Sequence, residues 1–237
     1  MKKLNIDLVK NISWQQKEVY RTLRTNIKFT GIKNQVIALT SCMPHEGKST
    51  ISYNLANVFA ESGKKTLYID ADLRKSKLLK ELGIKESLVG LSHLLSEQKT
   101  IDEVIYATQN EHFFILPTGP FPINPTELLE DESFEQLIQT VRELFEYIII
   151  NCPPLAASID AAVIAKKVDG SILVLESNHI SRAEARNTIK QLKLANPNIL
   201  GVVLNKLDRK ISPYYSKKYS YYNQYGNYGD HSDKGEA

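Results

Sequence analysis

Short apolar runs alternate along the chain with segments whose apolar positions recur every three or four residues. The runs at residues 35–41 (QVIALTS) and 66–72 (TLYIDAD) have the length and composition of strands buried in a sheet. Between them, residues 48–61 carry apolar side chains at helical spacing, and Gly63 follows as a stop signal. A strand, a helix and a second strand in this order predict two parallel strands joined by a covering helix.

The same alternation continues through most of the chain. It predicts an α/β fold in which a parallel β-sheet is flanked by helices on both faces. The runs at 171–175 and 199–204 are apolar enough to be read as buried strands. Further strands are predicted at residues 113–116 and 147–150, and further helices at 76–82, 91–95, 133–146 and 182–194.

The apolar pattern ends after Asp208. Residues 209–237 are rich in Tyr, Ser, Lys, Gly and Asn and have no core-forming pattern. We therefore expect one folded domain over residues 1–208 and a flexible, disordered tail over 209–237. Seven tyrosines lie within fifteen residues of this tail: Tyr214, Tyr215, Tyr219, Tyr221, Tyr222, Tyr225 and Tyr228.

Composition narrows the class of protein. The chain has 237 residues, 42% of them hydrophobic, and its formal net charge is only +3 with scattered basic residues, which argues against nucleic acid as a partner. The N-terminus has no apolar signal-peptide core, and the longest apolar runs fall far below the roughly 20 residues that cross a bilayer. Because two cysteines cannot form a disulfide framework, a cytoplasmic setting is expected. Any membrane association is expected to depend on a partner.

Residues 42–50 (CMPHEGKST) have the pattern of a phosphate-binding loop, in which backbone N–H groups between a strand and a helix converge on phosphate oxygens. Lys48 is expected to reach the β- and γ-phosphates, Ser49 to give its hydroxyl to Mg²⁺, and Thr50 to lie near the α-phosphate. The match is imperfect because Cys42 stands where the pattern has its first glycine. The nucleotide-binding residues predicted in this loop are Met43, Pro44, His45, Glu46, Gly47, Lys48, Ser49 and Thr50.

Two carboxylates, Asp70 and Asp72, follow the strand after the phosphate loop. Side chains two apart on a strand point the same way, so both should face the ligand crevice at the carboxyl edge of the sheet. Like charges so close need a cation or a shared proton, and Mg²⁺ bound by Asp72 is the natural use. The alternative is a solvated turn with two capping aspartates.

Another apolar strand, at residues 147–150, ends where phosphate-loop enzymes usually carry a second acid on the magnesium side. This chain has Asn151 there, followed by Cys152 and two prolines. An amide can hydrogen-bond a metal-bound water, but it carries no charge. Asn151 is therefore a candidate catalytic position, with a simple turn cap as the alternative.

These motifs together resemble those of bacterial tyrosine kinases of the capsular and exopolysaccharide biosynthesis type, in the split form whose cytoplasmic kinase is a separate chain from its membrane adaptor. The resemblance covers nearly all of the sequence. It rests on the phosphate loop, a D-x-D-x-R segment that ends at Arg74, the 148–154 segment, the tyrosine-rich tail, and an E-x-x-R-x-x-R motif at residues 18–24.

The resemblance implies an ATP-dependent tyrosine autokinase that phosphorylates its own tail tyrosines and regulates capsular or exopolysaccharide synthesis and export. The implied cofactors are ATP or ADP and Mg²⁺. The implied partners are a membrane adaptor of the polysaccharide co-polymerase type, which would hold the kinase at the inner face of the cell membrane, and a cognate tyrosine phosphatase. Asn205 and Lys206 resemble the family's adenine-contacting pair, with a plain strand-end turn as the alternative.

The same resemblance implies a homo-oligomeric ring, an octamer, joined by an N-terminal helix at about residues 14–30. Glu18, Arg21 and Arg24 are three residues apart and share one face of such a helix. Without the resemblance, an exposed, solvated helix would be the default interpretation of this segment.

Two departures from the family pattern bear on activity. His45 replaces a glycine of the loop and brings a Cβ to a position that favours glycine. Asn151 replaces the family's aspartate, which leaves Asp70 as the candidate base and Lys48 and Asp72 as its catalytic partners. Two alternatives follow: a nucleotide-binding scaffold with weakened chemistry, and a partition-type ATPase. The second is less favoured, because that class carries an extra lysine where this chain has Met43.

Overall fold

The computed structural model describes residues 2–4, 12–31, 34–196 and 198–207. The predicted tail and its seven tyrosines lie outside these residues.

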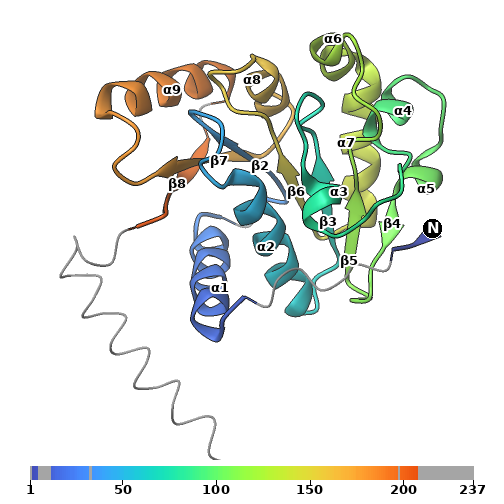
Figure 1. Cartoon of the computed structure of the whole chain (residues 1–237), viewed down its shortest axis with the longest axis horizontal. Coiled ribbons are helices and arrows are strands. Elements are labelled where there is room, and N and C mark those ends of the chain that lie inside the picture. The colour runs from blue at the N-terminus through green and yellow to red at the C-terminus, as the bar shows by residue number, and fades with distance from the viewer. Residues whose placement is uncertain (1, 5–11, 32–33, 197, 208–237) are drawn as a thin grey trace, which may run out of the picture.

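The described residues form a sheet of eight strands in the order β1-β4-β5-β3-β6-β2-β7-β8 (Figure 1). Neighbouring strands are parallel except β4 and β5, which are antiparallel. The predicted mostly parallel α/β architecture is confirmed. The strands are β1 (Lys2–Lys3), β2 (Val36–Ser41), β3 (Thr66–Asp70), β4 (Tyr106–Ala107), β5 (Phe113–Leu116), β6 (Tyr147–Asn151), β7 (Gly170–Glu176) and β8 (Ile199–Asn205).

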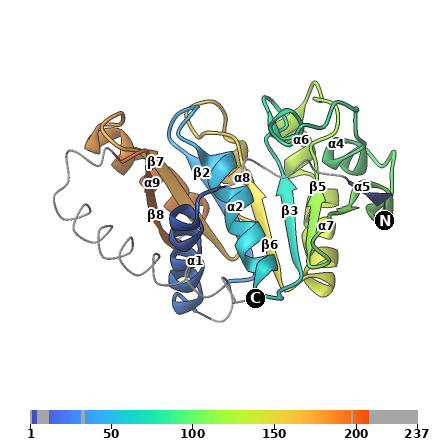
Figure 2. The same cartoon turned by 60° about the horizontal axis from the view of Figure 1, so that its bottom comes forward.

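Helices cover both faces of this sheet, as the alternating pattern predicted. Helices α1 and α2 lie side by side on one face, and α7, α8 and α9 lie on the other (Figures 1 and 2). The helices are α1 (Trp14–Phe29), α2 (Lys48–Glu61), α3 (Leu78–Glu81), α4 (Leu91–Leu95), α5 (Ile101–Val104), α6 (Pro125–Glu130), α7 (Glu132–Leu144), α8 (Asp160–Ala165) and α9 (Arg182–Ala195).

The core lies in two layers because strand side chains alternate between the faces. In β3, Leu67 and Ile69 pack in one cluster with Phe134 of α7, whereas Tyr68 packs in the other with Phe59 of α2. All five residues are buried. This double burial explains why the central strands are continuously apolar.

Two features of the sheet differ from the sequence-based expectation. The strand predicted over 66–72 ends at Asp70, and the chain turns away there so that the Asp72 N–H donates back to Asp70 Oδ1 at 3.3 Å. The prediction of a buried strand at 199–204 is wrong: β8 forms, but none of its seven residues is buried. Apolar composition alone does not distinguish a central strand from an edge strand.

The position of α2 creates the site. The helix begins at Lys48, directly after β2 and its loop, and no side chain caps its N-terminus. Its first backbone N–H groups therefore remain open toward the carboxyl edge of the sheet. Among the described helices, none is long and apolar enough to cross a membrane.

Candidate phosphate-binding and phosphoryl-transfer site

The phosphate loop has two residues in the left-handed region of backbone space. Gly47 has φ 90°, and a Cβ there would collide with the side-chain amide of Asn205, so only glycine fits. His45 has φ 70°, which confirms the expectation that this position favours glycine. The His45 backbone is therefore strained, and the surrounding contacts hold it in place.

The buried side chain of Glu46 fixes the conformation of the phosphate loop. Its side chain is fully buried, and its carboxylate accepts hydrogen bonds from the backbone N–H groups of Met43 at 2.7 Å and Glu176 at 2.9 Å. Glu46 was predicted from the sequence to be one of the nucleotide-binding residues. The structure places its carboxylate on the protein side, where it ties the loop to β7.

Asn205 and Lys206, at the end of β8, meet the loop from the other side. The Asn205 amide donates to the Glu46 carbonyl at 2.8 Å. Lys206 Nζ donates to the His45 carbonyl at 2.8 Å and pairs with Glu176 at 2.9 Å. The structure thus brings together two segments that lie about 160 residues apart in the chain. Contact of Asn205 and Lys206 with adenine stays a prediction.

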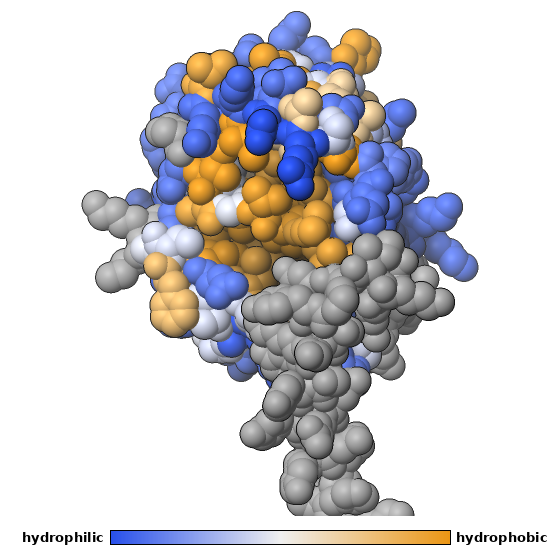
Figure 3. All heavy atoms as spheres, turned by 90° about the vertical axis from the view of Figure 1, so that its left-hand side faces the viewer, coloured by the Kyte–Doolittle hydropathy of each residue, from blue (hydrophilic) through white to orange (hydrophobic). Residues whose placement is uncertain are grey.

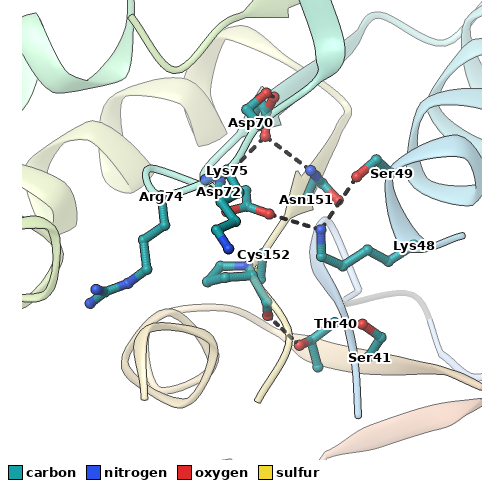
Figure 4. A network of polar contacts seen from close by, with 12 residues as sticks. Thr40, Ser41, Lys48, Ser49, Asp70, Asp72, Arg74, Lys75, Asn151 and Cys152 are labelled. Atoms are coloured by element: carbon teal, nitrogen blue, oxygen red, sulfur yellow. Dashed lines mark hydrogen bonds and ion pairs between the residues drawn. The ribbon is translucent and has the colours of Figure 1, made fainter. Parts of the chain in front are cut away.

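Lys48, Ser49 and Asp72 converge at the N-terminus of α2 (Figure 4). Lys48 Nζ lies 2.9 Å from Asp72 Oδ2 and donates to Ser49 Oγ at 3.3 Å. The Lys48 and Asp72 side chains are only 11% and 7% exposed, so this ion pair is weakly screened by water. A lysine, a hydroxyl and a carboxylate face one small volume beside open helix N–H groups.

Asp70 lies behind this group and is completely buried. The Asn151 amide donates to its Oδ1 at 2.9 Å (Figure 4), and the Ser76 hydroxyl donates to its Oδ2. Burial raises the pKa of Asp70 to about 6, although the hydrogen bonds from Ser76 and Asn151 and the charge of Lys48 oppose this rise. Asp70 is therefore poised to change its protonation close to neutral pH.

Arg74 points away from Lys48 and holds a different acid. Its Nε and Nη2 bind the two carboxylate oxygens of Asp160 at 2.7 and 3.0 Å, and Thr126 donates to Asp160 at 2.7 Å. Burial favours the neutral form of Asp160, but these bonds outweigh it and hold its pKa below the ordinary value. Asp160 is thus a fixed anion that connects the β3 loop to α6 and α8.

Sequence reasoning missed Ser76, Asp160 and Thr126. Each lies between 6 and 86 residues from the partner it serves. No local spacing pattern marks them, and a serine before a short helix is an ordinary capping signal.

The donor set fits a nucleotide polyphosphate with Mg²⁺. Backbone N–H groups and Lys48 suit phosphate oxygens, while Ser49 and Asp72 are oxygen ligands of the kind Mg²⁺ prefers. Within the described part of the chain, no cluster of three or more His, Cys, Asp or Glu side chains could hold a metal by itself. Mg²⁺ is commonly bound by one or two protein groups together with substrate phosphates.

The E-x-x-R-x-x-R residues lie on α1, outside this site. Arg21 pairs with Glu18 at 2.5 Å, and Arg24 Nη1 donates to the Val58 carbonyl of α2 at 2.5 Å. The three residues share one side of the helix, as their spacing predicted. Their role in oligomerisation stays a prediction.

The parallel sheet, the phosphate loop and the carboxylates at the sheet edge define a phosphate-loop nucleotide-binding domain. Residues 34–200 match the family described as an AAA domain. The chain is 41% identical over 197 residues to the tyrosine-protein kinase CpsD of Streptococcus pneumoniae serotype 4, covering 83% of this chain and 87% of that protein. It is 36% identical over 207 residues to the tyrosine-protein kinase YwqD of Bacillus subtilis, covering 86% and 85%.

Solved structures agree with these relatives. The kinase domain of the Escherichia coli tyrosine kinase ETK superposes with a TM-score of 0.81 at 30% identity, over 90% of this chain and 84% of that one. The chain belongs to the bacterial tyrosine kinase family, and it is a protein-tyrosine kinase of that family. This kinship favours the kinase hypothesis over a partition-type ATPase.

Proposed function

We propose that this protein is an ATP- and Mg²⁺-dependent autokinase whose acceptors are its C-terminal tyrosines. The observation that carries the proposal is the convergence of Lys48, Ser49 and Asp72 at an open helix N-terminus, with the titratable Asp70 directly behind them. Bound Mg·ATP would supply the transferable phosphoryl group and a metal charge beside its phosphates. The protein residues then have to position the reactants, neutralise charge and move one proton.

Each residue has a distinct part in this proposal. Lys48 neutralises phosphate oxygens, and Ser49 and Asp72 hold the metal. Asp70 accepts the phenolic proton as the tyrosine oxygen bonds to phosphorus and ADP leaves. Asp70 is buried, but Ser76 is half-buried and donates directly to it, so the Ser76 hydroxyl links the acid to the surface.

The distribution of tyrosines supports the tail as acceptor. The chain has twelve tyrosines, and seven of them lie between residues 214 and 228. The other five are Tyr20, Tyr53, Tyr68, Tyr106 and Tyr147, and each of these is buried or partly buried. A kinase that modifies exposed phenols would therefore leave the domain tyrosines untouched.

We further propose that the kinase acts in capsular or exopolysaccharide synthesis, as a ring at the inner face of the membrane. A polysaccharide co-polymerase adaptor and a tyrosine phosphatase are the partners in this proposal. Its basis is the family resemblance together with the exposed α1 motif. The boundary between a domain at 1–208 and a tail at 209–237 is part of the same proposal.

A second candidate function is a nucleotide-binding scaffold with weakened chemistry. It is favoured by one observation: position 151 is a neutral amide that donates to the candidate base. Incubation of the full chain with ATP and Mg²⁺, followed by mass mapping of tail peptides, separates the two. Phosphate on several tail tyrosines, absent in Lys48→Met and present in the surface control Lys80→Met, supports the autokinase. Nucleotide binding without any tail phosphate supports the scaffold.

A further inference from the structure

The two edges of the sheet are built differently. The edge at β1 is two residues long, and both residues are lysines, which is a common way to prevent a sheet from extending. The edge at β8 is seven residues long, with the sequence ILGVVLN, and contains no charge and no proline. It pairs with β7 on one side, and no described strand pairs with its other side. The unpaired backbone N–H and C=O groups of such an edge can form hydrogen bonds with another strand.

The surface around β8 is also apolar. Val202 and Leu204 are 49% and 47% exposed, and Leu207 just beyond the strand is 37% exposed. Figure 3 views the side of the molecule that carries β8, α1 and α9, and it shows a continuous hydrophobic area bordered by hydrophilic residues. We call Val202, Leu204, Leu207 and the free edge of β8 the β8 surface. An exposed apolar area next to an unpaired strand indicates a docking site.

We propose that residues 214–222 of the same chain add to β8 as an antiparallel strand and cover the β8 surface. The described chain leaves β8 at this surface, and residues 206–213 connect Asn205 to Tyr214. Those eight residues exceed the two that an antiparallel return requires. Ser212-Pro213 is a turn signal directly before the proposed strand, and a proline is tolerated there.

The segment has the composition of an edge strand. Tyrosine is favoured in strands, and Tyr215, Tyr219 and Tyr221 fall on one face at period-two spacing, together with Lys217, whose long side chain can keep its charge at the rim. These rings suit an apolar surface and leave their hydroxyls at its rim. Lys217 and Lys218 would blunt the new outer edge, as lysines do at β1. The segment thus carries the protective charges that β8 lacks.

Docking would also control the kinase, and this consequence rests on the proposed function. The loop that holds Lys48 follows β2, and the order β2-β7-β8 puts a strand beyond β8 three strand spacings away, roughly 14 Å. Docked tyrosines are therefore held away from Lys48. A phosphate adds about −1.5 to −2 charges, which an apolar surface disfavours, so a modified tail should not return.

Hydrogen–deuterium exchange of the full, unphosphorylated chain tests the docking without relying on kinase activity. The backbone amides of 214–222 should exchange at least about tenfold more slowly than in a Val202→Lys/Leu204→Lys variant. Leu194→Lys, at an 88% exposed position on α9, is the matched control and should leave tail exchange unchanged. Exchange in β2 and β3 reports whether each variant still folds.

A Tyr219→Ser/Tyr221→Ser variant, which leaves the domain intact, should also release the tail. Three results would overturn the proposal: tail amides that exchange at the free-peptide rate in the wild type, protection that survives the Lys variants, or protection that disappears on dilution. The last would assign the β8 surface to a second copy. Because none of these readouts needs phosphoryl transfer, failure of the docking is distinguishable from failure of the autokinase.

Discussion

Asn151 donates a hydrogen bond of 2.9 Å to Oδ1 of Asp70, and both side chains are buried. The family pattern places an acid at position 151, where two buried carboxylates would meet. Such a pair needs a cation or a shared proton. The amide instead satisfies one oxygen of Asp70 and helps the carboxylate to stay ionised. Compared with the family pattern, position 151 therefore carries one negative charge less.

Restoring the acid should raise activity. We expect Asn151→Asp to increase tail autophosphorylation at saturating Mg²⁺ by at least about tenfold, equivalent to ~1.4 kcal/mol of barrier. The gain should shrink when Mg²⁺ is lowered, because the new carboxylate then faces Asp70 without a cation. Initial rates over a Mg²⁺ titration measure this. A rate at or below that of the wild type would show that position 151 is not the missing acid.

The protonation of Asp70 should affect both the rate of autophosphorylation and the free energy of unfolding. Activity should fall as pH drops through about 6, because Asp70 must be ionised to accept a proton. Its folded-state pKa lies above its ordinary value of 3.8, so the folded protein binds more protons between these pH values. The stability that Asp70 contributes at low pH is therefore lost as pH rises from about 4 to 6.

Thermal unfolding of the wild type and of Asp70→Asn at several pH values tests whether the stability that Asp70 contributes falls as the pH rises. One pKa unit corresponds to about 1.4 kcal/mol, so the wild type should lose on the order of 2–3 kcal/mol relative to the variant across that window. The variant should also lack kinase activity at every pH. A constant difference in stability between pH 4 and 7 would contradict the assignment.

Ser76 should act through Asp70. Its hydroxyl lowers the pKa of Asp70, so Ser76→Ala should move the acid limb of the pH–rate profile to higher pH as well as slow the reaction. Ser76→Thr keeps a hydroxyl and should restore the profile. If Ser76→Ala is slower but its pH–rate profile is not shifted, the serine only stabilises the start of α3.

The α1 motif gives a prediction about assembly. Arg21 is 42% exposed and contacts Glu18 of its own helix, whereas Arg24 reaches the Val58 carbonyl of α2. Arg21→Ala should therefore shift a ring-sized oligomer toward monomer in light scattering with little change in melting temperature. Arg24→Ala should do the same but also loosen α1. Lys28→Ala is the control on the same helix, and an unaltered mass in all three would leave 18–24 as a solvated helix.

The strain at His45 predicts a stabilising substitution. A non-glycine residue at φ 70° costs on the order of 1 kcal/mol, so His45→Gly should raise the free energy of unfolding by up to about that amount. Gly47→Ala should do the reverse and abolish nucleotide binding, because its Cβ meets the Asn205 amide. Chemical denaturation and nucleotide titration measure the two effects. A less stable His45→Gly would show that the histidine side chain makes a compensating contact.

The positions of most helices and strands could be predicted from the sequence. The pattern of apolar positions identified α2 with its limits and every central strand, since strands buried on both faces read as near-continuous apolar runs. Elements of four to six residues carry little periodicity, so their prediction was uneven: α5, α6 and α8 were missed, whereas α3 and α4 were predicted. The phosphate loop and Asp70-x-Asp72 were found because their geometry depends only on neighbours in the chain.

The sequence by itself determined the α/β sheet architecture and the phosphate loop, and it selected Lys48, Ser49 and Asp72 as site residues, because these features follow from spacing within one strand, loop or helix. Only the tertiary structure decided which distant groups complete the site. Ser76 and Asn151 reach Asp70, and Asp160 binds Arg74, through contacts that no local spacing encodes. Strand order likewise decided that β8 is an edge and not a buried strand. The apolar run of β8 is the same in either place, and only the absence of a neighbouring strand among the described residues exposes it.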